Sequence, residues 1–166
     1  MTSKTLYIIV CGAPLASRTG DGVRAARERG WEPYVIPTYA AVPWLAAQDL
    51  GDAPVITGNR APDQPKRIPP ADAVAVVPMT FNTLNAWANG TANTYPFTTL
   101  CAALGARTPA VAVPFAKHDL AGHPAWPCVS RGTSIRGCAD LGRPKRIVRI
   151  FRTDQIGNWL CSRSRI

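Results

Sequence analysis

A cluster of hydroxyl and amide side chains follows one of the apolar segments of the chain. Thr80, Asn82 and Thr83 fall within four positions, soon after the apolar run 72–77 and Pro78. A single Thr or Asn is enough to cap a helix, so three of them suit hydrogen bonds to a ligand. A phosphate group or the polar edge of a heterocycle takes such bonds. We therefore interpret this segment as a candidate binding loop.

A second candidate loop follows the first apolar run, residues 5–11. Gly12, Ala13 and Pro14 break that run, and small residues continue to Ser17. A small-residue turn that opens a helix presents backbone N–H groups and the positive end of the helix dipole to an anion, typically a phosphate. The alternative is a plain strand–helix turn. The turn lacks the GxGxxG pattern of a dinucleotide site.

Histidine and cysteine are too sparse for a metal centre or a disulfide framework. The two histidines lack neighbouring ligands, and the five cysteines, at positions 11, 101, 128, 138 and 161, form no CxxC pair. We therefore expect no metal ion, and we expect the chain to work in a reducing cytoplasm.

The positive charge of the chain is concentrated at its C-terminal end. Of the net charge of +9, residues 1–124 carry +2 (ten basic, eight acidic) and residues 125–166 carry +7 (nine basic, two acidic). The body is thus nearly neutral, and nucleic acid is not an expected partner. No apolar run approaches the roughly 20 residues of a membrane helix, so no membrane is expected either. The run 5–11 imitates a signal peptide, but a first buried strand explains it as well.

Strand-like and helical patterns alternate over residues 1–124. Short apolar runs rich in β-formers predict strands at 5–11, 31–37, 72–77 and 109–113, with a possible edge strand at 53–57. Helical patterns occupy about 16–29, 42–50 and 83–104, the last broken near Gly90 and Pro96. This alternation predicts an α/β fold, a three-layer Rossmann-like (flavodoxin-like) parallel sheet with helices on both faces. Beyond Pro124 the one strand-like stretch is 147–151.

The predicted fold brings the candidate loops together. Ligands of open parallel sheets bind outside the carboxyl ends of the strands. The loops 12–17, 37–41 and 78–83 follow three predicted strands, so they should meet at one edge.

An asparagine repeat follows the third of these loops. Asn85, Asn89 and Asn93 recur at every fourth position, which places them on one face of the predicted helix 83–104. Asn is a poor helix former, and we therefore predict a packed or inter-subunit polar contact rather than a solvated face.

The segment 78–94 resembles the homo-oligomeric flavin-containing cysteine decarboxylase (HFCD) flavoproteins. That family has a Pro-Ala-Ser-Ala-Asn-Thr turn, then a helix with Ala-x-Gly and an Ala-Asp-Asn-Leu-like segment. The matching residues here are Pro78, Thr80 in place of Ser, Asn82, Thr83, Ala88, Gly90, Ala92 and Asn93. The order of elements agrees over roughly 4–124.

The resemblance implies FMN as cofactor and a homotrimer built partly on helix 83–104, often assembled into a dodecamer. It implies that the FMN phosphate lies near Gly12–Pro14, Thr38 and the loop 78–83, with Asn82 beside the flavin ring or the substrate. The implied cofactor-binding residues are Gly12, Ala13, Pro14, Ser17, Thr38, Pro78, Thr80, Asn82, Thr83 and Asn93.

Two catalytic features of the family are missing. The peptidyl-cysteine decarboxylases have a His about 14 residues before the Pro of the turn, and the segment 62–67 has none. They also have a Pro-x-Met-Asn-x-x-Met-Trp segment, of which Pro114 remains and Lys117 replaces the Asn. We expect Lys117 or His118, together with Asn82, to bind the substrate carboxylate or transfer a proton; the alternative is that Lys117 and His118 are solvated loop residues.

The resemblance implies FMN-dependent oxidative decarboxylation of the C-terminal Cys of a ribosomally synthesised precursor peptide, giving an enethiol. The alternatives are a phosphopantothenoylcysteine decarboxylase, a flavin prenyltransferase or a non-catalytic FMN-binding scaffold subunit. We divide the chain into an FMN-binding domain, 1–124, and a basic tail, 125–166. The tail is either a clamp over the substrate or an unstructured end.

Overall fold

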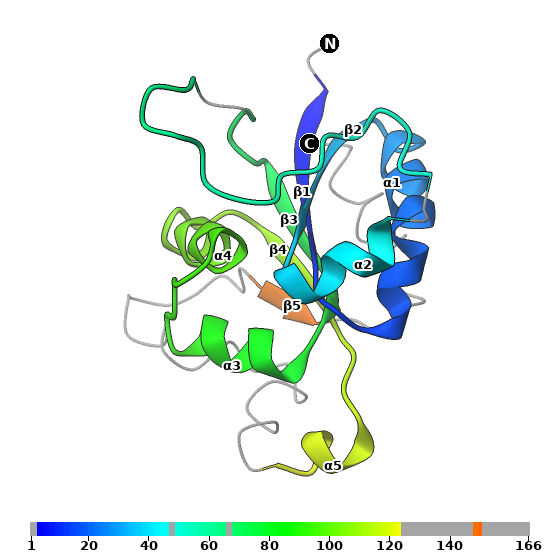
Figure 1. Ribbon diagram of the computed structural model, residues 1–166, viewed down its shortest axis with the longest axis vertical. Coiled ribbons are helices and arrows are strands. Elements are labelled where there is room, and N and C mark those ends of the chain that lie inside the picture. The colour runs from blue at the N-terminus through cyan, green and yellow to red at the C-terminus, as the bar shows by residue number, and fades with distance from the viewer. Residues whose placement is uncertain (1–2, 47–48, 66–67, 124–147, 151–166) are drawn as a thin grey trace.

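A computed structural model of the chain describes residues 3–46, 49–65, 68–123 and 148–150. Five parallel strands form one sheet in the order β2-β1-β3-β4-β5 (Figure 1). They are β1 (Lys4–Val10), β2 (Trp31–Pro37), β3 (Ala73–Met79), β4 (Ala110–Pro114) and β5 (Val148–Ile150). This is the strand order of flavodoxin-like proteins, and it confirms the predicted fold class.

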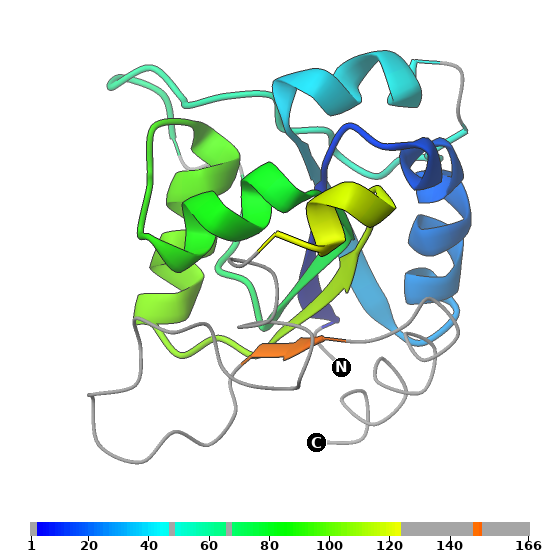
Figure 2. The same ribbon diagram turned by 90° about the horizontal axis from the view of Figure 1, so that it is seen from below.

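Helices cover both faces of the sheet, as predicted. They are the α-helices α1 (Thr19–Arg27), α2 (Val42–Leu45), α3 (Phe81–Ala88), α4 (Tyr95–Gly105) and α5 (His118–Ala121), and the 3₁₀ helices η1 (Pro14–Arg18) and η2 (Tyr39–Ala41). Figures 1 and 2 show α1 and α2 on one face and α3 and α4 on the other. In the described part of the chain, no helix has the length and apolar character needed to cross a membrane.

The central strand β1 is buried from both sides, which explains its continuous apolar sequence. Leu6 and Ile8 pack in the same cluster as Val23 of α1. On the opposite face, Ile9 packs in the cluster that contains Leu84 of α3. Full burial of such a side chain contributes about 1.5–3 kcal/mol, so the two apolar faces of the sheet hold the three layers together.

Several elements are shorter than the sequence predicts. The first helical segment starts as η1, and α1 begins only at Thr19. The helix predicted over 42–50 ends at Leu45, and the edge strand predicted over 53–57 is a single parallel bridge between Val35 and Val55. Pro at the first turns of η1 and α2 fits a helix start but does not extend the helix.

The break predicted near Gly90 is confirmed, and it removes the predicted amide face. Gly90 has φ +69°, which ends α3 at Ala88. Asn85, Asn89 and Asn93 therefore do not share one helix face, and the prediction of an amide stripe on one helix is wrong; a contact of these side chains between subunits stays a prediction.

The side-chain amides of Asn85 and Asn89 donate hydrogen bonds to backbone carbonyls of α3 instead. The Asn85 side chain donates to the Phe81 carbonyl at 3.0 Å, and the Asn89 side chain donates to the Asn85 carbonyl at 2.8 Å. Bonds to the preceding turn are a common use of such side chains in a helix.

The strand-like stretch predicted over 147–151 is confirmed as β5, which pairs with β4. The remainder of 125–166 lies outside the described residues. The division into a domain and a tail, and the role of the tail, therefore stay predictions.

We expect the substitution Trp87→Phe to destabilise the chain by about 1–3 kcal/mol, because it leaves a gap and removes a buried hydrogen bond. Trp87 is 1% exposed, and its indole N–H donates to the Leu100 carbonyl at 3.1 Å, which ties α3 to α4. Urea denaturation measures the loss. Tyr39→Phe is the control, since Tyr39 is 96% exposed, and equal stability of both variants would contradict the assigned role of Trp87.

Candidate functional site

The carboxyl ends of β1 and β3 mark the switch point of the sheet. From β1 the chain continues to β2 on one side, and from β3 it continues to β4 on the other. Connections that leave in opposite directions open a crevice at the strand ends, where ligands of this fold class bind. Figure 2 looks onto this edge of the molecule.

Two hydrogen bonds hold the loops after β1 and β3 together. The Cys11 N–H donates to the Pro78 carbonyl at 3.2 Å. The Cys11 thiol and the Thr83 hydroxyl lie 3.1 Å apart, and both side chains are buried. The predicted loops 12–17 and 78–83 therefore meet, as the topology required.

The loop after β2 joins the same edge. The Thr38 N–H donates to the Val10 carbonyl at 2.8 Å, which places Thr38 beside the end of β1. A Cβ on Gly12 would lie 2.5 Å from the Ala40 carbonyl oxygen, so only glycine permits this approach of the two loops. All three predicted loops thus meet at one edge of the sheet.

Two threonine hydroxyls at this edge do not cap the helices that they precede. Thr38 and Thr80 occupy N-cap positions, yet neither side chain makes a capping hydrogen bond. The Thr80 hydroxyl lies 3.1 Å from the Thr83 hydroxyl and retains further hydrogen-bonding capacity. Both Thr38 and Thr80 are half-buried, so their hydroxyls are available to a ligand in the crevice.

The first turn of α3 supplies backbone donors at the same place. Within the described residues, the N–H groups of Asn82 and Thr83 have no acceptor. Such unpaired donors and the helix dipole favour an anion. Together with the Thr38 and Thr80 hydroxyls, they fit the phosphate group of a cofactor.

Cys11 is a site residue that sequence reasoning missed. Burial raises the pKa of its thiol, and hydrogen bonds with Thr83 and Thr80 partly oppose that rise. The thiol therefore stays protonated at neutral pH and acts as a link between β1 and α3. The available signal was its place at the end of the first apolar run, on the face that the Thr-rich loop approaches.

Some predicted cofactor-binding residues are placed less favourably. The predicted loop 78–83 is wrong in its length, since β3 continues to Met79 and α3 starts at Phe81. Pro78 is therefore buried within the strand, and its carbonyl is taken by Cys11.

Three other predicted residues, Ser17, Asn82 and Asn93, lie at the surface, whereas Ala13 is buried. Asn82 is exposed on the first turn of α3, and Ser17 is exposed with its hydroxyl donating to the Pro14 carbonyl at 2.8 Å. Asn93 is exposed in the segment between α3 and α4.

A backbone hydrogen bond connects the segment after β4 to the end of β3. The Phe115 N–H donates to the Met79 carbonyl at 2.9 Å, so the end of β4 adjoins the end of β3. Lys117 is exposed, and the His118 side chain is fully exposed, 3.7 Å from Asp119. Neither is enclosed in the crevice, and their catalytic roles stay predictions.

A different histidine approaches the binding loop. The ring of His123 meets that of Phe81 edge-on, with 5.5 Å between the ring centroids. Phe81 begins α3, so His123 lies closer to the first turn of that helix than the sequence pattern indicated. Among the described residues no group of three His, Cys, Asp or Glu side chains is arranged to hold a metal ion.

No protein-family model and no curated protein matches the sequence. Solved structures do match the fold. The FMN-dependent cysteine decarboxylase TvaF from thioviridamide biosynthesis is 18% identical, with a TM-score of 0.69 over 98% of each chain. The FMN-dependent cysteine decarboxylase SpaF is 18% identical, with a TM-score of 0.66 over 98% of each chain.

A mutant PPC decarboxylase in complex with pantothenoylaminoethenethiol is also similar. It is 17% identical, with a TM-score of 0.64 over 74% of this chain and 72% of that one. Together with the crevice between β1 and β3, these likenesses show that the chain has the fold of the HFCD flavoproteins, as the segment 78–94 predicted.

Proposed function

We propose that the chain binds FMN in the crevice between β1 and β3 and decarboxylates the C-terminal Cys of a peptide. The observation that carries the proposal is the meeting of three strand-end loops beside two threonine hydroxyls that make no capping bond and beside the unpaired N–H groups of the first turn of α3. That arrangement suits the phosphate of FMN, and the fold is shared with FMN-dependent cysteine decarboxylases over nearly the whole chain.

The protein residues hold the cofactor and the substrate in place. Thr38, Thr80 and the first turn of α3 bind the phosphate, and Cys11 keeps the loops after β1 and β3 at a fixed distance. Asn82, exposed at the crevice, orients the ring or the substrate carboxylate. FMN supplies the two-electron oxidation, and loss of CO₂ from the oxidised cysteine leaves an enethiol.

A peptide is the proposed substrate, and a homotrimer, with a dodecamer as the larger form, is the proposed assembly. Both come from the resemblance of the segment 78–94 to the HFCD flavoproteins. A phosphopantothenoylcysteine decarboxylase and a flavin prenyltransferase remain the alternatives within the same fold.

The exposure of the predicted catalytic side chains favours a second candidate function. Lys117 and His118 are in solvent, and the sequence of the segment 62–67 contains no histidine. A flavoprotein subunit that binds FMN without turnover needs none of these groups. This scaffold function is the competing proposal, and it predicts the same colour but no reaction.

We expect purified protein to carry FMN, identified by absorption and by the mass of the released chromophore. Thr80→Val should raise the Kd for FMN about tenfold, because it removes one hydrogen bond to a charged group. Thr98→Val is the matched control, since the Thr98 hydroxyl donates to the Ala92 carbonyl in an exposed loop. A colourless protein that does not take up added FMN would sink the proposal and the scaffold alternative together.

We expect a peptide ending in Cys to lose about 46 Da, the mass of CO₂ and two hydrogens, when FMN acts as the oxidant. Mass spectrometry of the peptide measures the loss, and a peptide ending in Ser is the substrate control. Asn82→Ala should lower the turnover about tenfold at saturating FMN. Asn89→Ala should not, because its amide bonds only to its own helix. A yellow protein without mass loss would replace the decarboxylase by the scaffold.

A further inference from the structure

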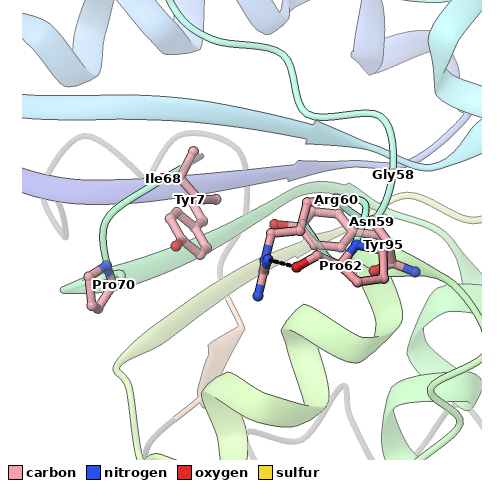
Figure 3. Close-up of a pocket in the computed structure, with 8 residues that line it drawn as sticks. All are labelled: Tyr7, Gly58, Asn59, Arg60, Pro62, Ile68, Pro70 and Tyr95. Carbon is pink, nitrogen blue, oxygen red and sulfur yellow. Dashed lines mark hydrogen bonds between the residues drawn. The ribbon is translucent and has the colours of Figure 1, made fainter. Parts of the chain in front are cut away.

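A cavity of about 590 Å³ lies against β1, away from the proposed FMN site. One wall is β1, another is the start of α4, and residues of the stretches 58–62 and 68–70 form the rest (Figure 3). The lining residues are Tyr7, Gly58, Asn59, Arg60, Pro62, Ile68, Pro70 and Tyr95. Its volume falls within the range of about 300–1,000 Å³ typical of small-molecule sites.

This cavity is separate from the crevice at the strand ends. Tyr7 and Cys11 project from the same face of β1, and four residues of a strand span about 13 Å. Ile9, between them on that face, is completely buried and closes the direct path. Pro70 precedes β3, so this part of the cavity lies toward the start of that strand.

Arg60 gives the cavity a positive charge in a fixed position. It is the one charged residue among the eight that line the cavity. Its Nη1 donates to the Pro62 carbonyl at 3.3 Å (Figure 3). It also donates to the Gln64 carbonyl, and the two bonds orient the guanidinium. A guanidinium has five N–H donors, so donors remain for an anion, and a carboxylate matches their fork.

The other walls are aromatic and apolar. Tyr7 and Tyr95 contribute rings, and Ile68 and the prolines contribute aliphatic surface. Burial raises the pKa of Tyr7 to about 12, and its hydroxyl donates to the Pro69 carbonyl, so Tyr7 acts as a neutral wall. In the described part of the chain, the Tyr95 hydroxyl has no hydrogen-bond partner.

We propose that this cavity is a second ligand site, which binds an aromatic carboxylate. The ring lies between the tyrosines and Ile68, and the carboxylate accepts hydrogen bonds from Arg60. Tyr95 is also the first residue of α4, so the positive end of that helix dipole adds to the attraction. The carboxylate belongs either to a free aromatic acid or to the terminal residue of a peptide.

The test is calorimetric titration of the full chain with naphthalene-2-carboxylate in the presence of excess FMN. Naphthalene-2-carboxamide, the neutral analogue, is the ligand control. We expect the acid to bind with a Kd below about 1 mM and at least fivefold more tightly than the amide. Arg60→Gln should weaken binding of the acid at least tenfold and leave binding of the amide unchanged. Equal binding of acid and amide, or no binding of the acid, would overturn the proposal.

Two further variants separate recognition from loop stability. Arg24→Gln removes an exposed arginine from α1, on the other face of the sheet, and should bind the acid as the parent does. Asn59→Asp leaves the Arg60 hydrogen bonds in place and adds a negative charge at the rim. It should weaken binding of the acid but not of the amide. If Arg60→Gln does not fold, this variant tests the proposal in its place. Unchanged binding in Asn59→Asp would then overturn the proposal.

A peptide arm identifies the source of the carboxylate. Gly-Gly-Phe that binds more tightly than its C-terminal amide and more tightly than naphthalene-2-carboxylate assigns the site to a peptide terminus; weaker binding assigns it to a free acid. None of these titrations requires bound FMN, so loss of the FMN proposal leaves this result readable.

Discussion

The contact between the ends of β1 and β3 is the constraint on which the site depends. At a switch point the chain leaves the two strands in opposite directions, so no connection spans the gap between them. Here Cys11 spans it, with its N–H on the Pro78 carbonyl and its thiol beside the Thr83 hydroxyl. These bonds are buried, and an unmade bond there would leave polar atoms without partners. The Thr-rich turn is thereby fixed against the small-residue turn after β1.

The strands were predictable because a strand buried on both faces has an uninterrupted run of apolar residues. Trp31–Pro37 matches the predicted range at both ends, and β1 is displaced by one residue. The helices were less predictable, since their ends depend on single backbone conformations. The positive φ of Gly90 ends α3. The spacing of the asparagines at every fourth residue predicts one helix face only if the helix continues past Gly90, and it does not. Four residues of α2 carry too little pattern to fix its end.

The location of the site followed from topology, whereas the tasks of its residues did not. Any parallel sheet with this order gathers loops 12–17, 37–41 and 78–83 at one edge. Composition cannot show that Thr38 and Thr80 stand at N-caps without capping, because that depends on their rotamers. Nor can it show that His118 faces solvent while His123 meets Phe81. Exposure and side-chain direction come only with the packed structure.

The polar groups of the crevice also limit the kind of chemistry it can perform unaided. Of the described side chains, the buried polar ones are threonines, and no charged side chain is buried. The Cys11 thiol is held neutral because burial raises its pKa. General acid–base catalysis needs a titratable group within reach of the reacting atoms and tuned near neutral pH. A crevice that offers hydroxyls and N–H groups instead is suited to fixing a cofactor that carries the redox step itself.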